Sequence, residues 1–223
     1  MEIFHVLNRG VDKRVIFQDN SDYLRFTYGL YLFNDCKILN TASRSFKEHM
    51  SDIARRTKED ERELLVDIHA FCLMPNHYHL LLSPKIENGI SKFMKKLDMG
   101  YAKYFNIKNE RVGSLFQGRY KSIQVDNELH LFHLPYYIHM NPLDLFDSEW
   151  RTNRIKNPDK AIKFLEDYKW SSFLDYIGKS NFPFVTNRNM LLEVFNYEGG
   201  HRKHIAQWLK EMNIEHINSI ILE

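Results

Sequence analysis

The sequence predicts an α+β fold: a ferredoxin-like antiparallel sheet with helices, followed by a helical C-terminal extension. The first observation is the order of the expected elements, strand–helix–strand, strand–helix–strand, helix, which is the split βαβ pattern. The second is that two strand-like runs meet at Pro75-Asn76, which favours an antiparallel hairpin. The third is composition, because 223 residues with 43% hydrophobic and 27% charged residues can bury an ordinary globular core.

The first elements precede a long charged stretch. Residues 2–8 are typical of a short strand, and an Arg-Gly turn signal ends it. Capping residues at 19–21 then begin a helix that runs to about residue 34. Residues 43–65 are so rich in charge that we expect an exposed helix or an insertion there, with a solvated face as the simpler interpretation.

The other elements of the sheet unit follow from alternation, helical spacing and turn residues. Gly100 weakens the second helix, and Pro135 should kink or divide the third. The expected elements are strands at 66–74, 77–83 and 120–125, a helix over 90–105, and a helix from Asp126 or Asn127 to Met140.

The chain is expected to divide into a sheet domain, residues 1–143, and a C-terminal extension, residues 144–223. Proline-containing breaks at 157–158 and 181–183 should separate the helices of the extension. Its last piece, about 199–223, begins with two glycines and continues as an amphipathic run.

Composition excludes several classes of protein. The formal net charge is +2, so the chain is not a wholly basic, histone-like binder. Two cysteines, Cys36 and Cys72, cannot form a disulfide scaffold or a four-thiolate zinc site. We see no run of 18 apolar residues and no signal peptide, so we expect no membrane association and a cytoplasmic location.

His77 and His79 are the first candidate site residues. They lie two positions apart on an expected strand, so both imidazoles point to the same face. Neutral imidazoles side by side can bind one divalent cation. The simpler interpretation, which the pair alone does not exclude, is two partly exposed strand histidines.

Tyr137 and Asn141 form the second candidate group. They are four residues apart on an expected helix and therefore share one face. The Asn141 amide oxygen could complete a metal site, and Tyr137 would place a hydroxyl nucleophile one turn away. A phenol needs help to react at neutral pH, and a metal bound to the electrophile supplies it. Alternatively, Tyr137 is a core aromatic and Asn141-Pro142 a helix stop.

Positive charge is concentrated in the middle of the chain. Residues 92–123 hold eight lysines and arginines against two acidic residues, a local net charge of +6. Six aromatic residues are interleaved with them, as in grooves that bind single-stranded nucleic acid. A solvated helix face with core aromatics explains the same pattern.

Several ordered motifs resemble one known family. The segment LMPNHYHLLL (73–82) resembles the signature of the HUH single-tyrosine, IS200-like transposases. Other segments resemble the REP-associated tyrosine transposase branch of that family. They are FHVLNRG (4–10), YAKYFN (101–106), GSLFQGRYKS (113–122), YIHMNPL (137–143) and WSSF (170–173).

The resemblance implies a transposase-type endonuclease and strand transferase. Such enzymes cut single-stranded DNA beside a hairpin through a 5′-phosphotyrosine and leave a free 3′-hydroxyl. By motif, Tyr137 is the nucleophile, His77 and His79 are metal ligands, and Asn141 is the third ligand. The metal would be Mg²⁺ or Mn²⁺, and imidazole with amide suits manganese at least as well. Relatives act as homodimers or as monomers.

DNA contacts are expected from seven residues, and two other functions stay open. The contact residues are Arg9, Lys95, Lys96, Lys103, Gln117, Arg119 and Lys121. One alternative is a non-catalytic single-stranded nucleic-acid-binding protein on the same fold, which would need aromatic residues on the sheet face where this chain has histidines. The other is a metal-dependent hydrolase that uses activated water and does not need Tyr137.

Histidines elsewhere in the chain offer further alternatives for the site: His5, His69, His130 and His133. His133 lies four residues before Tyr137 on the same helix face and could orient or deprotonate the phenol. His139 should point away from that face.

Overall fold

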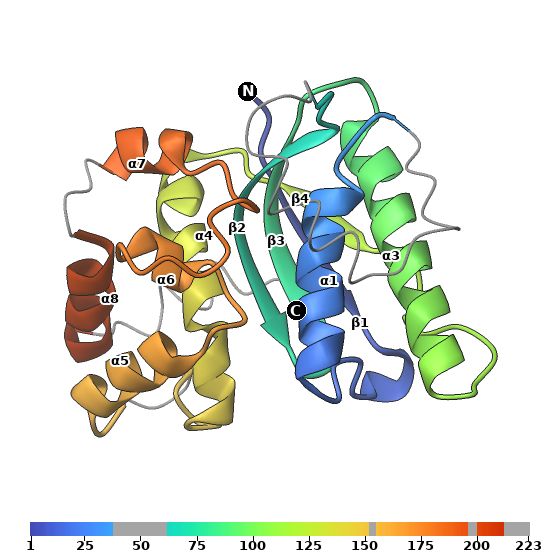
Figure 1. Cartoon of the computed structure of the whole chain (residues 1–223). Coiled ribbons are helices and arrows are strands. Elements are labelled where there is room, and N and C mark those ends of the chain that lie inside the picture. Colours follow the sequence, from blue (N-terminus) through green and yellow to red (C-terminus); the bar gives the residue numbers. More distant parts are fainter. Residues whose placement is uncertain (38–61, 152–154, 196–199, 212–223) are drawn as a thin grey trace.

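The computed structural model describes residues 1–37, 62–151, 155–195 and 200–211 (Figure 1). Most of the charged stretch 43–65 lies outside these ranges. The elements are β1 (Phe4–Arg9), η1 (Val11–Lys13), α1 (Asn20–Leu32), β2 (Val66–Met74), β3 (His77–Pro84), α3 (Gly89–Lys108), β4 (Lys121–Gln124), α4 (Glu128–Met140), η2 (Asn141–Leu145), α5 (Pro158–Asp167), α6 (Phe173–Tyr176), α7 (Asn189–Phe195) and α8 (Gly200–Glu211).

The four strands form one antiparallel sheet in the order β2-β3-β1-β4. This confirms the expected ferredoxin-like α+β fold. The hairpin between β2 and β3 turns at Pro75 and Asn76, as predicted. Since β1 enters between β3 and β4, the N-terminal strand lies beside the strand that carries the histidine pair.

Helices α1 and α3 cover one face of the sheet (Figure 1). Tyr78, Leu80 and Leu82 alternate along β3 and point into this layer, where Phe26 of α1 and Phe93 of α3 meet them. Asp19 caps α1 by accepting hydrogen bonds from the Ser21 and Asp22 backbone amides. The helix therefore begins where the capping residues predicted.

Helix α4 and the C-terminal extension cover the opposite face (Figure 1). Leu134 and Ile138 of α4 pack with Ala70 and Leu81 of the sheet. The other side of α4 packs against the extension, with Met140 inside the cluster formed by α5 and α8. Because α4 is buried on two sides, its sequence is apolar almost all round.

The extension also pairs with the edge of the sheet. The Leu73 amide donates to the Trp170 carbonyl at 2.9 Å, and Ser171 forms an isolated antiparallel bridge with Cys72. The helices of the extension are interrupted at both proline-containing segments, as the sequence predicted. Asn157-Pro158 begins α5, and residues 181–183 lie between α6 and α7.

Two expectations about glycine and proline are corrected. Gly100 does not limit α3, because a Cβ at this position would lie 2.6 Å from the Phe33 ring and only glycine leaves room for it. Pro135 does not divide α4, which continues past it to Met140. None of the helices within the described ranges is both long and apolar enough to span a bilayer.

Candidate active site

The histidine pair lies at the centre of the sheet. Register places His79 opposite Leu7 and His77 opposite Arg9, so both imidazoles point to the face covered by α4. Their ring centroids are 4.9 Å apart and their planes are nearly perpendicular, at 85°. His79 is 0% exposed and His77 is 6% exposed. The pair is therefore together, as the strand spacing predicted, but it is buried rather than partly exposed.

Each ring is oriented through its Nδ1 atom. His77 Nδ1 donates to Asn76 Oδ1 at 2.6 Å, which leaves the lone pair of the neutral ring on Nε2. His79 Nδ1 shares a hydrogen bond of 3.0 Å with Nε2 of His5 on β1. Such partners fix the ring orientation and tautomer of metal-binding histidines. The geometry is therefore suited to metal binding through Nε2.

Tyr137 meets this group from α4. Its ring centroid is 5.8 Å from that of His79 and 6.2 Å from that of His5, edge-on in both cases. The contact exists because Leu134 and Ile138, on the same side of α4, dock onto the sheet. Tyr137 is 0% exposed, so a substrate reaches it only if its surroundings move.

Asn141 stands at the C-terminal cap of α4. Its Nδ2 donates to the Tyr137 backbone carbonyl at 2.9 Å. Its Oδ1, the atom expected to bind a metal, accepts a hydrogen bond of 2.8 Å from Arg151 Nη2. The structure therefore brings Tyr137 to the histidines, whereas the contacts of Asn141 are with Tyr137 and Arg151. The amide oxygen keeps a second lone pair for another ligand.

Other histidines serve different surroundings. His139 points away from the sheet, as predicted, with Nε2 2.7 Å from Ser172 Oγ and Nδ1 2.7 Å from His201 Nε2. Burial lowers the pKa of His139 well below its usual value, and burial lowers that of His201 to about 3. Both rings are therefore neutral. His133 stacks on Trp208 of α8 at 6.2 Å.

The donor set is suited to a cation bound by imidazoles and oxygen. In the part of the chain that the structure describes, no three His, Cys, Asp or Glu side chains converge as a metal site. A site built on His77 and His79 therefore needs oxygen ligands of another kind, such as an amide, DNA phosphate or water. Imidazole with oxygen donors is compatible with Mn²⁺.

Basic residues surround a cavity at the end of β1. This cavity of about 250 Å³ is lined by Leu7, Asn8, Arg9, Gln117, Gly118, Arg119 and Lys121, and so includes four of the seven expected DNA contacts. A second cavity of about 390 Å³ contains Arg9, His77 and Asp144. Arg9 lines both cavities, so the basic surface continues to the histidine pair.

The loop that carries Gln117 and Arg119 is fastened to β1. The Gln117 amide donates to the Arg9 carbonyl at 3.0 Å, and Asn8 Nδ2 donates to the Gly118 carbonyl at 3.2 Å. Asn8 Nδ2 also contacts Asp98 Oδ2 of α3 at 3.0 Å. Burial raises the pKa of Asp98 to about 6, although hydrogen bonds from Tyr78 and Asn8 oppose that shift.

The remaining three expected DNA contacts lie elsewhere on α3. Lys95 and Lys96 line a largely apolar cavity of about 460 Å³ with Leu32 and Phe33 of the α1 end. Lys103 is exposed on the same helix. The structure therefore separates the seven residues into a group beside the histidine pair and a group on α3.

Comparison with known proteins identifies the region that contains the site. A family model described as "Transposase IS200 like" matches residues 37–141. The matched range includes His77, His79, Tyr137 and Asn141. Residues 37–141 are therefore similar to the IS200-like transposases. The family resemblance of the sequence motifs is thereby confirmed.

No curated protein matches the sequence. One solved structure, described as the REP associates tyrosine transposase bound to a REP hairpin, aligns with a TM-score of 0.45 and 14% sequence identity. The alignment covers 83% of this chain and 87% of that chain.

Sequence reasoning missed three participants. His5 was named among the alternatives without its contact to His79, although alternation along β1 places it on the same sheet face. Arg151 and Asp144 were not singled out, because they follow the motif region and only the three-dimensional packing brings them to Tyr137. The sequence signal that could have found them is the presence of an acidic and a basic residue, Asp144 and Arg151, shortly after the helix that carries Tyr137.

Proposed function

We propose that this protein is a transposase-type, metal-dependent single-stranded DNA endonuclease and strand transferase that cuts beside a hairpin through a 5′-phosphotyrosine intermediate. The observation that carries the proposal is the edge-on contact of Tyr137 with His79, 5.8 Å between ring centroids, next to His77. A nucleophilic hydroxyl beside a candidate two-imidazole metal site is the arrangement that such chemistry needs.

The roles follow from the positions of the side chains. Tyr137 Oη attacks the scissile phosphorus, the bond to the 3′ oxygen breaks, and a free 3′-hydroxyl leaves. His77 and His79 would hold Mg²⁺ or Mn²⁺, with Asn141 as the third protein ligand. When bound, the cation supplies Lewis-acid stabilisation of the phosphate and holds it in place. His5 and Asn76 keep the two rings in their tautomers.

DNA would approach along the basic surface. Arg9 lines both the cavity with Arg119 and the cavity with His77, so a strand held at the first can reach the second. We assign the hairpin-side contacts to Arg9, Gln117, Arg119 and Lys121. Lys95, Lys96 and Lys103 would contact a more distant part of the DNA, because they lie on α3.

Substrate binding must open the site. Tyr137 and His79 are 0% exposed, whereas His77 reaches the 390 Å³ cavity. We therefore propose that DNA entry shifts the end of α4 and η2 only enough to admit the scissile phosphate between Tyr137 and the histidines. Since Tyr137 and the histidines belong to the same chain, a monomer is sufficient for cleavage, and a homodimer is the alternative arrangement.

A nucleic-acid binder that uses an open sheet face receives less support. Strands β2 and β3 are buried along nearly their whole length, with helices on both faces (Figure 1). In the described part of the chain, bases therefore have no open central sheet on which to stack. A binder that used only the basic cavity would leave Tyr137 without a role.

The test is incubation of the full chain with single-stranded hairpin DNA and Mn²⁺, followed by denaturing electrophoresis. The wild type should give a slower band in which DNA is covalently attached. Tyr137→Phe should bind DNA and give no such band, and His77→Ala or His79→Ala should lose metal-dependent cutting. Covalent product from Tyr137→Phe, or cutting by a histidine variant in excess chelator, would reject the proposal.

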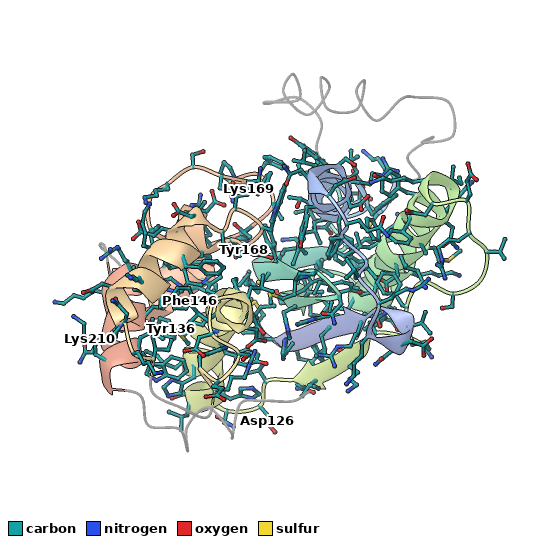
Figure 2. The ribbon with its side chains drawn as sticks, turned by 90° about the horizontal axis from the view of Figure 1, so that it is seen from below. Asp126, Tyr136, Phe146, Tyr168, Lys169 and Lys210 are labelled. Atoms are coloured by element: carbon teal, nitrogen blue, oxygen red, sulfur yellow. The ribbon has the colours of Figure 1, made fainter. Side chains whose placement is uncertain are left out.

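Tyr136 provides the matched control. It precedes Tyr137 on α4 but lies among the side chains of the extension (Figure 2). Its ring stacks on that of His201, with 4.9 Å between the centroids. Tyr136→Phe removes the hydroxyl of a buried tyrosine on the same helix and leaves the histidine pair unchanged. We expect this variant to form the covalent product at a rate close to that of the wild type.

A further inference from the structure

Arg151 lies over the ring of Tyr137 although it comes from the C-terminal extension. Its Cζ atom is 5.1 Å from the centroid of that ring. Asp144 holds the guanidinium at two points, with Nε 2.9 Å from Oδ1 and Nη2 3.0 Å from Oδ2. Nη2 also donates to Asn141 Oδ1. One guanidinium thus joins the candidate nucleophile and the candidate third metal ligand.

The remaining nitrogen of this guanidinium, Nη1, is buried and makes no hydrogen bond among the residues that the structure describes. Burial lowers the pKa of Arg151, but the hydrogen bonds to the Asp144 carboxylate and the electrostatic effect of the neighbouring Tyr137 outweigh burial and raise the pKa, so the group is charged. A buried charged donor without an acceptor costs free energy. Its position beside Tyr137 is suited to an anion that is bound during function.

We infer that Arg151 is a catalytic residue whose Nη1 donates a hydrogen bond to a non-bridging oxygen of the scissile DNA phosphate. The inference rests on the proposed function and adds a residue to it. As the bond from Tyr137 Oη to phosphorus forms and the bond to the 3′ oxygen breaks, negative charge remains on the non-bridging oxygens. The phenolic proton ends on the released 3′-hydroxyl. A fixed guanidinium fork stabilises that charge.

The surroundings of Arg151 support this assignment. Its partner Asp144 lines the 390 Å³ cavity together with His77 and Arg9, on the route proposed for the phosphate. The ion pair fixes the direction of the guanidinium, so little reorganisation is needed during the reaction. Opening the end of α4 would expose Nη1 and Tyr137 Oη to the same phosphate.

The test compares the wild type with Arg151→Ala on two DNA hairpins. One has the natural phosphodiester at the scissile linkage, and the other has a neutral methylphosphonate there. On the phosphodiester, Arg151→Ala should slow formation of the covalent product by about 10²–10³-fold. On the methylphosphonate the two proteins should react at similar rates, because the charge that Arg151 stabilises is absent.

Two further variants make the comparison decisive. Arg202→Ala removes a surface guanidinium that pairs with Glu166, and it should behave as the wild type on both substrates. In Arg151→Ala the partner carboxylate of Asp144 is left unpaired, which could by itself disturb folding. The double variant Asp144→Ala with Arg151→Ala removes both members of the ion pair, so it separates a folding defect from the loss of the guanidinium. It should show the same dependence on substrate charge as the single variant.

The outcomes separate this inference from the proposed function. An equal defect on both substrates for Arg151→Ala and for the double variant would show that Arg151 only maintains the structure, and would overturn the inference. A normal rate on the phosphodiester would overturn it as well. If the wild type forms no covalent product on either substrate, the proposed function itself is overturned and the inference with it.

Discussion

At the scale of single residues, His79 is where the parts of the site meet. Its ring contacts His77 on its own strand, His5 on β1 and Tyr137 on α4. Three elements therefore depend on one buried imidazole. Contacts of this kind fix the ring orientation and the tautomer of a histidine that binds a metal.

The first prediction concerns His5. His5→Ala removes the hydrogen-bond partner of His79 Nδ1, so the affinity for Mn²⁺ should fall by about 10–100-fold. Raising the Mn²⁺ concentration should restore DNA cutting. Calorimetric or electron paramagnetic resonance titration with Mn²⁺ measures the dissociation constant.

His69→Ala is the control for His5. His69 is a buried histidine of the same sheet whose hydrogen-bond partners are Ser83 Oγ, 2.8 Å from Nε2, and the Asn187 carbonyl, 3.3 Å from Nδ1. Its loss should leave the Mn²⁺ affinity close to that of the wild type. Equal affinities in both variants would show that His5 has no supporting role.

The second prediction concerns Asp98 and pH. Burial raises its pKa from 3.8 to about 6, so between these values the folded state binds more protons than the unfolded state. The stabilising contribution of protonated Asp98 is therefore present below about pH 4 and lost as pH rises to about 6. Asp98→Asn lacks this titration and keeps an acceptor for the Tyr78 hydroxyl.

The measurement for Asp98 is the free energy of unfolding in urea from pH 4 to pH 7. As pH rises across that range, the free energy of unfolding of the wild type should fall by about 2–3 kcal/mol relative to that of Asp98→Asn. A difference that does not depend on pH would contradict the prediction.

At the scale of elements, α4 is held from two sides. On one side Leu134 and Ile138 pack on the sheet, and on the other His139 lies between Ser172 and His201. Ser172 Oγ also accepts a hydrogen bond of 2.9 Å from the Phe71 amide of β2. A single buried hydroxyl thus connects the tyrosine helix, the edge strand and the extension.

The third prediction follows from that connection. Ser172→Ala leaves His139 and the Phe71 amide without their buried partner, so the free energy of unfolding should fall by about 1–3 kcal/mol. Ser171→Ala is the control, because Ser171 Oγ accepts one long bond of 3.3 Å from the Phe173 amide. Urea unfolding measures both variants. A larger loss for Ser171→Ala would contradict this account of α4.

The elements themselves could largely be predicted from the sequence because their signals are local. Strand alternation and the Pro75-Asn76 turn gave the β2–β3 hairpin, and the same alternation placed His77 and His79 on one face. The expectation that Gly100 weakens its helix was wrong because this glycine makes room for the ring of Phe33, which is far away in sequence. Propensity describes a residue alone, whereas close packing between two helices decides which residue fits.

At the scale of the whole molecule, the extension completes the site. Tyr176 and Leu191 belong to the cluster that surrounds Tyr137, and Arg151 covers its ring. These contacts could not be predicted from the sequence, since no local pattern says that residues after 143 return to the sheet. Motifs located Tyr137 and the histidines but not the residues packed around them.

The fourth prediction is that residues 1–143 alone do not form a stable monomer. Without the extension, the edge of β2 and the apolar face of α4 would be exposed, and Leu73 would lose its backbone partner Trp170. Size-exclusion chromatography and circular dichroism should show aggregated or poorly folded protein. A folded, monomeric and DNA-cutting product would contradict this view of the extension.

The most direct test of the central claim is to identify the protein atom that becomes attached to DNA. After reaction with hairpin DNA and Mn²⁺, the covalent product is digested with protease and nuclease, and mass spectrometry identifies the peptide that carries the nucleotide. The 3′ end of the released strand is tested for a free hydroxyl. We predict a 5′-phosphate on the peptide containing Tyr137 and a free 3′-hydroxyl on the released strand. Attachment at another residue, or cut DNA with a free 5′-phosphate and no protein attached, would contradict it.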